Sequence, residues 1–291
     1  MLGFEAWKIH ARGGVITERN GDSCTVRVRI PAGVASADAV EGLARIARSF
    51  GDGTIHLTVR QTAEIPHVDP ARLEEIQAVL EENGTPVGAE RDEVVNVVAC
   101  PGIERCKYAN VETIELAREI DRAVFARQTP TKVRIAIAAC PYNCTAPQLN
   151  EIGIIGRIRP LRIPGLCNGC GTCMEYCRQG AISIKDGISV LDESHCVECG
   201  VCIHSCPYGL LRSEHLHYQI LVGGVRGMTP RPGRELVRVT TPEDVVAVVE
   251  KVVYWIYRRA WSGRLLADQL DEIDFAGLKQ EIEGEFSGTG T

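Results

Sequence analysis

The stretch CNGCGTCMEYC at residues 167–177 is matched in spacing by CVECGVCIHSC at residues 196–206. Each places four cysteines in the order C-x2-C-x2-C-x3-C. A third group of four is spread over two distant segments, with Cys100 and Cys106 in the first and Cys140 and Cys144 in the second. Of the thirteen cysteines in the chain, only Cys24 lies outside these groups. Thiols gathered in fours indicate metal clusters rather than a disulfide framework.

The two consecutive groups have the spacing of two-cluster bacterial ferredoxins, in which three close thiolates hold one [4Fe–4S] cluster and the fourth crosses to the other. Arg178 stands where the first run usually carries a proline. Zinc knuckles and disulfides are the alternatives, but zinc sites use four nearby ligands and rarely duplicate an eight-cysteine interlock. The predicted ligand sets are Cys167, Cys170, Cys173 and Cys206 for one cluster, and Cys196, Cys199, Cys202 and Cys177 for the second.

The third group cannot be held by one contiguous loop, because a helix-length gap separates Cys106 from Cys140. A cluster bound by two distant loops is positioned by the tertiary fold. We therefore expect it inside a packed domain.

Several stretches within and beyond the third group form a recognisable set: NVVACPG (96–102), CPYNC (140–144), IGIIG (152–156), LTVRQ (57–61), Lys132-Val133-Arg134 and Gly223-Gly224. Together they closely resemble the sirohaem-containing sulfite and nitrite reductases, and the resemblance covers residues 24–285. Within the family, one repeat with an inserted ferredoxin looks most like the catalytic subunit of anaerobic sulfite reductases.

The resemblance implies an α+β fold in three parts. Residues 1–85 would form the ferredoxin-like half-domain of the sulfite and nitrite reductases. Residues 86–164 and 213–286 would form the domain that binds sirohaem and the third [4Fe–4S] cluster, and residues 165–212 the inserted ferredoxin domain. The implied function is six-electron reduction of sulfite to sulfide, with electrons relayed through the ferredoxin clusters to the third cluster and sirohaem.

The resemblance also assigns residues to the site. Cys144 would bridge the third cluster to the sirohaem iron. Arg60, Lys132 and Arg134 would bind the substrate and supply protons, because preorganised positive charge in a dry pocket binds an anion strongly. The remaining sirohaem-binding candidates, besides Cys144 and Arg60, are Gln61, Arg105, Lys107, Gly223 and Gly224.

Three departures from the family matter. Val95 occupies the position of a usual arginine, which Arg91 could replace only if the loop is reshaped, and Ala139 replaces a usual glycine. The chain also carries one copy of a unit that most members carry twice. We therefore expect an oligomer in which the basic residues of one subunit face the haem ligated through Cys144 of another.

Composition limits the remaining options. The net charge of −6 gives no support to nucleic-acid binding. Thiols in such number, without a signal sequence or an unbroken apolar tract, predict a cytoplasmic protein with no membrane span. A flavin subunit, an iron–sulfur subunit or a ferredoxin is the expected electron donor. Nitrite as substrate, and a haem-free three-cluster electron-transfer subunit, remain the alternatives.

Hydrophobic periodicity predicts the elements that carry these residues. Lys132 and Arg134 are expected on one face of a strand whose end lies beside the Cys140 loop, and Arg60 at the end of another strand. A disordered tail is expected from Ser287. The predicted strands are 25–30, 55–60, 94–99, 132–138 and 217–222, and the predicted helices are 37–50, 70–82, 111–127 and 242–261.

Overall fold

Alternating buried residues build the first sheet, which is antiparallel and has the strand order β1-β2-β4-β3. The computed structural model describes residues 13–162 and 167–286. Helices α2 and α3 pack on this sheet through a core that includes Ile46, Phe50, Ile76 and Leu80. The elements are β1 Val15–Thr17, β2 Cys24–Val28, α2 Ala37–Phe50, β3 His56–Leu57, β4 Ala63–Val68 and α3 Leu73–Glu82.

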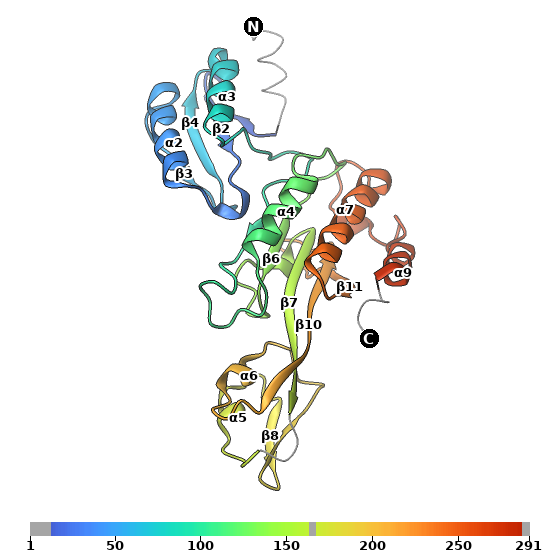
Figure 1. Ribbon diagram of the computed structural model, residues 1–291. Helices are drawn as coiled ribbons and strands as arrows, with labels where there is room; N and C mark the ends of the chain where they lie inside the picture. The colour runs from blue at the N-terminus through green and yellow to red at the C-terminus, as the bar shows by residue number, and fades with distance from the viewer. Residues whose placement is uncertain (1–12, 163–166, 287–291) are drawn as a thin grey trace.

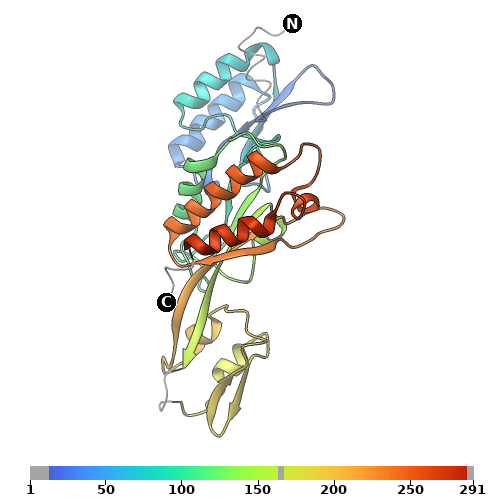
Figure 2. The ribbon, with the colours of Figure 1, turned by 90° about the vertical axis from the view of Figure 1, so that its right-hand side faces the viewer.

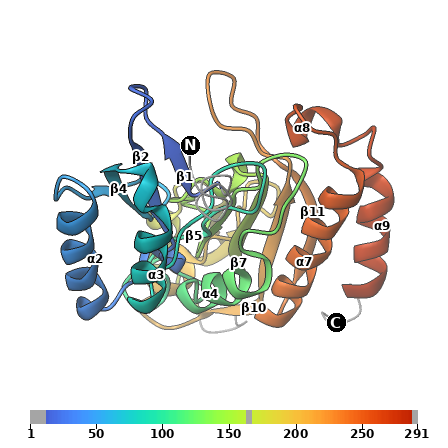
Figure 3. The same ribbon diagram turned by 90° about the horizontal axis from the view of Figure 1, so that it is seen from above.

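The second sheet has five strands in the order β11-β10-β7-β6-β5, of which β5, β6 and β7 run parallel. Helices α4 and α7 cover one face of it (Figure 2). Figure 3 shows α2 and α3 at one side of the molecule and α7 and α9 at the other. The elements are β5 Val98–Ala99, α4 Ile114–Val124, β6 Ile135–Ala138, β7 Ile152–Arg162, β10 Leu211–Val222, β11 Arg234–Val239, α7 Pro242–Arg259, α8 Leu266–Gln269 and α9 Phe275–Phe286.

Strands β7 and β10 continue beyond the second sheet as a two-stranded arm, residues 157–162 and 211–217. The arm carries the cysteine-rich segment, residues 167–210, away from the rest of the molecule (Figure 1). A small core of its own includes Cys173, Ile182 and Cys202. The elements of the segment are α5 Thr172–Tyr176, β8 Ile182–Lys185, β9 Ile188–Leu191 and α6 Val201–Ser205.

Two predicted helices begin and end close to where the sequence places them. Helix α2 spans Ala37–Phe50, and the Ser36 side chain caps it by accepting a hydrogen bond from the Ala39 amide. Helix α7 begins at Pro242 after Thr241, whose side chain accepts from the Asp244 amide. Both start signals are local, which explains why the sequence alone reveals them.

The prediction of a strand over 55–60 is largely wrong, because β3 is confined to His56–Leu57 and Arg60 lies in the turn that follows. Strand β4 was missed. Its sequence contains Pro66, and the pairing of β4 with β2 shifts register around this residue. A proline is tolerated in a strand at such a bulge, where no ladder hydrogen bond is required from it.

Other predicted elements are shorter than expected. The regular strands near 94–99 and 132–138 are reduced to β5 and β6, and the helix 111–127 to α4. Glu112 limits the start of α4, because its carboxylate accepts hydrogen bonds from the amides of Ile114 and Glu115. Strands β7 and β11 and helix α9 were not predicted. The predicted tail from Ser287 lies outside the described residues.

An ion pair joins the end of β2 in the first sheet to helix α4, which covers the second sheet. Arg29, just after β2, donates through Nε to Oδ2 of Asp121 on α4 at 2.8 Å, and its guanidinium lies 4.2 Å from the centre of the Phe125 ring. Asp121 is 1% exposed. Burial raises the pKa of Asp121, and Arg29 opposes that shift. The relative placement of the two sheets therefore depends in part on a buried carboxylate.

Among the described residues, no helix is long and apolar enough to span a membrane.

Replacing Arg29 by Met should leave the Asp121 carboxylate buried without a cation and lower the free energy of unfolding by about 3 kcal/mol. The folded-state pKa of Asp121 should then rise further, so the folded state keeps a proton that the unfolded state loses. The deficit relative to the native chain should therefore shrink as pH is lowered toward about 5. Denaturant unfolding followed by circular dichroism measures both effects.

The control is Arg118→Met, because the ion pair of Arg118 with Glu115 is exposed and Arg118 does not act on Asp121. Its loss should cost at most about 1 kcal/mol. Equal effects of the two substitutions, at every pH, would contradict the role assigned to Arg29.

Candidate functional site

The third cysteine group lies where the parallel strands β5 and β6 end. Cys100 follows β5 directly and Cys140 follows β6 by two residues, so the two loops meet at one edge of the sheet. Cys100 and Cys140 are buried, Cys106 is half-buried and Cys144 is exposed. The Ala139 amide donates a hydrogen bond to Sγ of Cys100 at 3.2 Å. Three thiols therefore face inward, and the fourth is accessible from outside.

These four thiols are close enough to influence one another. Burial raises the pKa of the Cys140 thiol to about 11, and Cys100, Cys106 and Cys144 act in the same direction. This shift disfavours the thiolate of Cys140 in the absence of metal, but a bound metal cluster deprotonates the thiols that coordinate it. The arrangement fits an iron–sulfur cluster held between two loops.

In the cysteine-rich segment, the thiols are grouped across the two runs. Cys167, Cys170 and Cys173 line one cavity together with Cys206. Burial raises the pKa of Cys202 to about 12, with further contributions from its neighbours in the second group, Cys199, Cys196 and Cys177. The fourth cysteine of each run thus lies with the first three of the other run.

Amide hydrogen bonds reach three of these sulfurs. The Ser189 amide donates to Cys167 at 3.4 Å and the Leu210 amide to Cys206 at 3.3 Å. The Glu198 amide similarly donates to Cys196 at 3.4 Å. Such bonds are one of the means by which a protein sets the potential of an iron–sulfur cluster. In the described part of the chain no three His, Cys, Asp or Glu side chains are gathered as ligands of a single metal ion.

The predicted substrate-binding bases form a cluster at the other end of the parallel strands, where these strands begin. Arg60 donates to the Asn96 carbonyl at 2.9 Å and to Oδ1 of Asn150 at 3.2 Å. Burial, together with the like charges of Arg226 and Arg134, lowers the pKa of Arg60 to about 10. Nε of Arg60 and Nε of Arg226 are buried without a hydrogen-bond partner.

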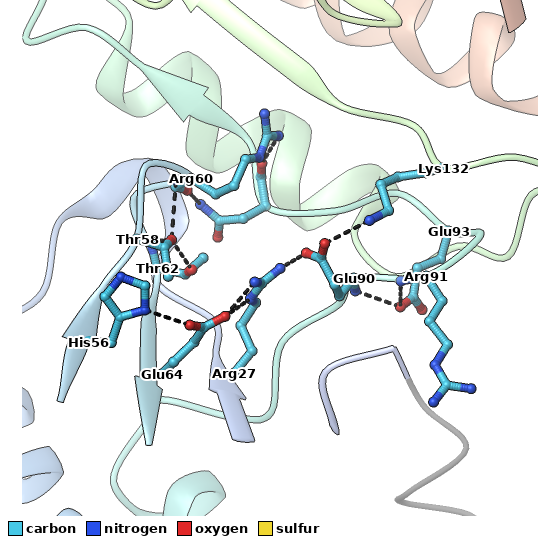
Figure 4. A network of polar contacts seen from close by, with 11 residues as sticks. Arg27, His56, Thr58, Arg60, Thr62, Glu64, Glu90, Arg91, Glu93 and Lys132 are labelled. Carbon is cyan, nitrogen blue, oxygen red and sulfur yellow. Dashed lines mark hydrogen bonds and ion pairs between the residues drawn. The ribbon is translucent and has the colours of Figure 1, made fainter. Parts of the chain in front are cut away.

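Carboxylates hold the other two bases. Nζ of Lys132 lies 2.6 Å from Oε1 of Glu90 (Figure 4), and Nη2 of Arg134 lies 2.5 Å from Oε1 of Glu151. Burial lowers the pKa of Lys132, with help from Arg134, whereas Glu151 raises that of Arg134. Within the described residues neither Arg60 nor Arg226 forms an ion pair with a carboxylate. The cluster therefore has a buried excess of positive charge.

The network continues away from these bases. Glu90 also pairs with Arg27, and Arg27 pairs with Glu64, which accepts from Nδ1 of His56 at 2.8 Å (Figure 4). These contacts connect β2, β3 and β4 to the loop that carries Glu90. They fix the turn that holds Arg60 relative to the second sheet.

One expectation about this cluster is wrong. Lys132 and Arg134 precede β6, whereas Cys140 follows it, so the bases do not lie beside the Cys140 loop. The four residues of β6 alone span about 13 Å. Residues 135–138 are also buried on both faces rather than on one. Lys132 and Arg134 therefore lie where β6 begins, and Cys140 lies beyond its end.

Several candidate sirohaem contacts are engaged within the chain. The Gln61 side chain donates to the Ala99 carbonyl at 2.7 Å and accepts from the Ala99 amide at 2.9 Å. Gly223 and Gly224 donate backbone bonds to Glu151 and Asn150. A Cβ on Gly224 would come within 2.4 Å of the Gln148 carbonyl, so close packing requires this glycine. The last two candidates, Arg105 and Lys107, are exposed beside Cys106.

Sequence reasoning missed Arg226, Glu90 and Glu151. Arg226 lies two residues beyond the predicted Gly223-Gly224 loop and donates to the Thr145 carbonyl at 2.7 Å. Its position after that loop was the available signal. Val95, where an arginine was expected, is buried and its amide donates to the Val133 carbonyl at 3.0 Å. The Arg91 side chain points away from Arg60 (Figure 4).

Comparison with known proteins shows which family this chain resembles. Residues 16–83 match the nitrite/sulfite reductase ferredoxin-like half domain, and residues 90–288 match the nitrite and sulphite reductase 4Fe-4S domain. The crystal structure of dissimilatory sulfite reductase I has the same fold, with a TM-score of 0.74 at 20% identity over 90% of this chain and 69% of that chain.

Two relatives are similar along most of the sequence. The coenzyme F420-dependent sulfite reductase of Methanocaldococcus jannaschii is 31% identical over 93% of this chain, which spans 44% of that protein. One of the subunits of the anaerobic sulfite reductase of Salmonella typhimurium is 30% identical over 82% of this chain and 76% of its own length. The present chain belongs to the nitrite and sulphite reductase family.

Proposed function

We propose that this protein reduces sulfite to sulfide at a sirohaem held beside the third cysteine group. One combination of features supports this proposal. Twelve thiols lie in three groups of four, and the chain also holds a cluster of bases whose charge the nearby carboxylates neutralise only in part. Cys100, Cys106, Cys140 and Cys144 would hold one [4Fe–4S] cluster, and the crossed sets of the cysteine-rich segment would hold two more. The exposed thiol of Cys144 fits a ligand shared between that cluster and a second cofactor.

Sirohaem, when bound, would supply an iron that keeps sulfite and its partly reduced forms in place while six electrons arrive. The chain supplies the rest. The half-buried guanidinium groups of Arg60 and Arg226, whose buried Nε atoms have no partner, favour an anion because nearby carboxylates do not neutralise them. Lys132 gives up its proton more readily than an ordinary lysine, because burial lowers its pKa. It is therefore the best proton donor of the group.

The placement of Lys132 and Arg134 at one end of β6 and of Cys140 at the other supports an active site formed between two copies of the chain. In this arrangement Arg60, Lys132 and Arg134 of one subunit would face the haem ligated through Cys144 of the other. Electrons would enter the cysteine-rich segment from a flavin subunit, an iron–sulfur subunit or a ferredoxin. Nitrite, which is also a small anion reduced by six electrons, is the second candidate substrate.

Anaerobically purified protein, expressed with a supply of sirohaem, should contain about twelve cluster irons and one haem iron per chain. Cys144→Ser should lose the haem absorbance, because this substitution removes the proposed shared ligand. Cys24→Ser is the matched control, since Cys24 is buried in β2 and belongs to none of the three groups. Visible spectra with iron and haem determination on each sample measure the difference.

About twelve irons and no haem in the native protein would contradict the proposed enzyme. That outcome would instead support a haem-free electron-transfer subunit with three clusters. The buried Val95 favours this alternative, because the family usually has an arginine at that position. Retention of haem in Cys144→Ser would assign its ligation to another residue.

Replacing Arg60 by Met should lower kcat/KM for sulfite by about 10²-fold, because one preorganised charge is removed from the anion site. Arg91→Met removes the same charge from an exposed position whose side chain points away from Arg60 (Figure 4). This control should keep the activity of the native chain. Steady-state kinetics with a reduced viologen as donor provide the measurement, and a loss of equal size in both variants would refute the assignment.

Mixed dimers test whether one site takes residues from two subunits. Arg60→Met subunits should have about 10²-fold lower kcat/KM alone, and Cys144→Ser subunits should be inactive alone; each variant carries a different affinity tag. Their hybrid should recover sulfite reduction, because it combines the intact bases of one subunit with the intact cysteine of the other. An inactive hybrid that retains its iron would show that bases and cysteine act within one chain.

A further inference from the structure

Four side chains form a continuous stack between the cysteine-rich segment and the second sheet. Nζ of Lys107 lies 5.0 Å from the centre of the Tyr108 ring. The Tyr108 and Tyr142 rings have centroids 5.1 Å apart and are tilted by 41°. The guanidinium carbon of Arg178 lies 5.5 Å from the centre of the Tyr142 ring. Two cations thus enclose a pair of aromatic rings, an arrangement that ring quadrupoles favour.

Each member of this stack stands next to a cluster cysteine in the sequence. Lys107 and Tyr108 follow Cys106, and Tyr142 lies between Cys140 and Cys144. Arg178 follows Cys177, whose thiol lies with those of Cys196, Cys199 and Cys202. The stack therefore connects the third cysteine group to one particular group of the cysteine-rich segment, the one that contains Cys177.

A second set of contacts joins the same two groups. The side-chain amide of Asn110 donates to the Cys199 carbonyl at 3.4 Å, and the backbone amide of Asn110 donates to the Ala139 carbonyl at 3.0 Å. The Ile158 amide donates to the Glu198 carbonyl at 2.9 Å, which attaches the Cys199 loop to β7. These contacts fix one end of that loop, and the stack restrains the neighbouring Cys177 loop.

The stack also accounts for an irregularity of the sequence. Arg178 stands where the first cysteine run would usually carry a proline, so the Cys177 turn has lost a rigid backbone restraint. The guanidinium that replaces it is exposed and lies over the ring of Tyr142, which belongs to the loop of the third cysteine group. The cysteine-rich segment thus lacks the restraint of a proline in its own turn. It has instead a contact between Arg178 and Tyr142, which joins the segment to the third cysteine group.

We propose that Arg178 and Tyr142 are positioning residues that hold the Cys177 loop against the Cys140 loop, and so set the rate at which electrons pass between these two cysteine groups. The inference rests on the proposed function, because it requires clusters at both groups. The step transfers one electron, oxidises the donor group and reduces the acceptor group, and neither makes nor breaks a bond. A low-potential one-electron donor, Ti(III) citrate in the test, supplies the electron.

The test compares Arg178→Gln and Tyr142→Leu with the native protein, loaded with iron and without substrate. Reduction of the third cluster after mixing with Ti(III) citrate is followed by freeze-quench electron paramagnetic resonance. Hydrogen exchange of residues 140–144 and 176–180 is measured on the same samples. Tyr142→Phe retains the ring, and Lys185→Gln removes a positive charge from the segment on β8.

Arg178→Gln and Tyr142→Leu should each slow reduction of the third cluster severalfold and accelerate amide exchange in both loops. The midpoint potentials and iron contents should stay unchanged, which separates loss of position from loss of a cluster. Tyr142→Phe and Lys185→Gln should behave as the native protein does. Equal rates and equal exchange in all five proteins would overturn the proposal.

Failure of the proposed function has a different signature. If the native protein carries clusters in the segment but none at the third group, no second transfer phase appears in any sample. Hydrogen exchange still decides the positioning role in that case. Faster exchange in Arg178→Gln supports it, and unchanged exchange rejects it.

Discussion

The parallel pairing of β5, β6 and β7 is the constraint on which the rest of the arrangement depends. A chain leaving the end of β6 must return along the whole strand before it can begin β7 in the same direction. The loop from Cys140 to Glu151 makes this return. It begins with two cysteines at one edge of the sheet and ends with Asn150 and Glu151 at the other, where they contact Arg60 and Arg134.

The charge distribution at the second edge follows from that return. Glu151 arrives next to Arg134 and Glu90 arrives next to Lys132, so a carboxylate partly neutralises each of these two bases. Arg60 and Arg226 are held by carbonyl and amide oxygens instead. Neutral acceptors fix the position of a guanidinium without cancelling its charge. The edge is therefore ordered and still attractive to an anion.

The sequence predicted what local patterns encode. Cysteine spacing anticipated how the thiols are grouped, and the caps Ser36 and Thr241 marked where α2 and α7 begin. It did not reveal β4, whose bulge at Pro66 disrupts the strand pattern. Nor did it identify Glu90 and Glu151 as the partners of Lys132 and Arg134, because the fold alone brings these carboxylates to the bases. Arg226 was missed for the same reason, since its neighbours Thr145 and Arg134 are brought to it only by the fold.

The arm formed by residues 157–162 and 211–217 has a consequence for how this protein can change in evolution. Side chains alternate across a strand, so adding one residue to each strand of the arm would turn the cysteine-rich segment over and carry Arg178 away from Tyr142. Adding two to each would keep its orientation but displace it by about 7 Å. Length changes that preserve the orientation of the segment therefore come in steps of two residues per strand, unless a bulge such as the one between Ser213 and His215 absorbs a single residue. The length of the two paired strands therefore sets the distance between the cysteine-rich segment and the third cysteine group.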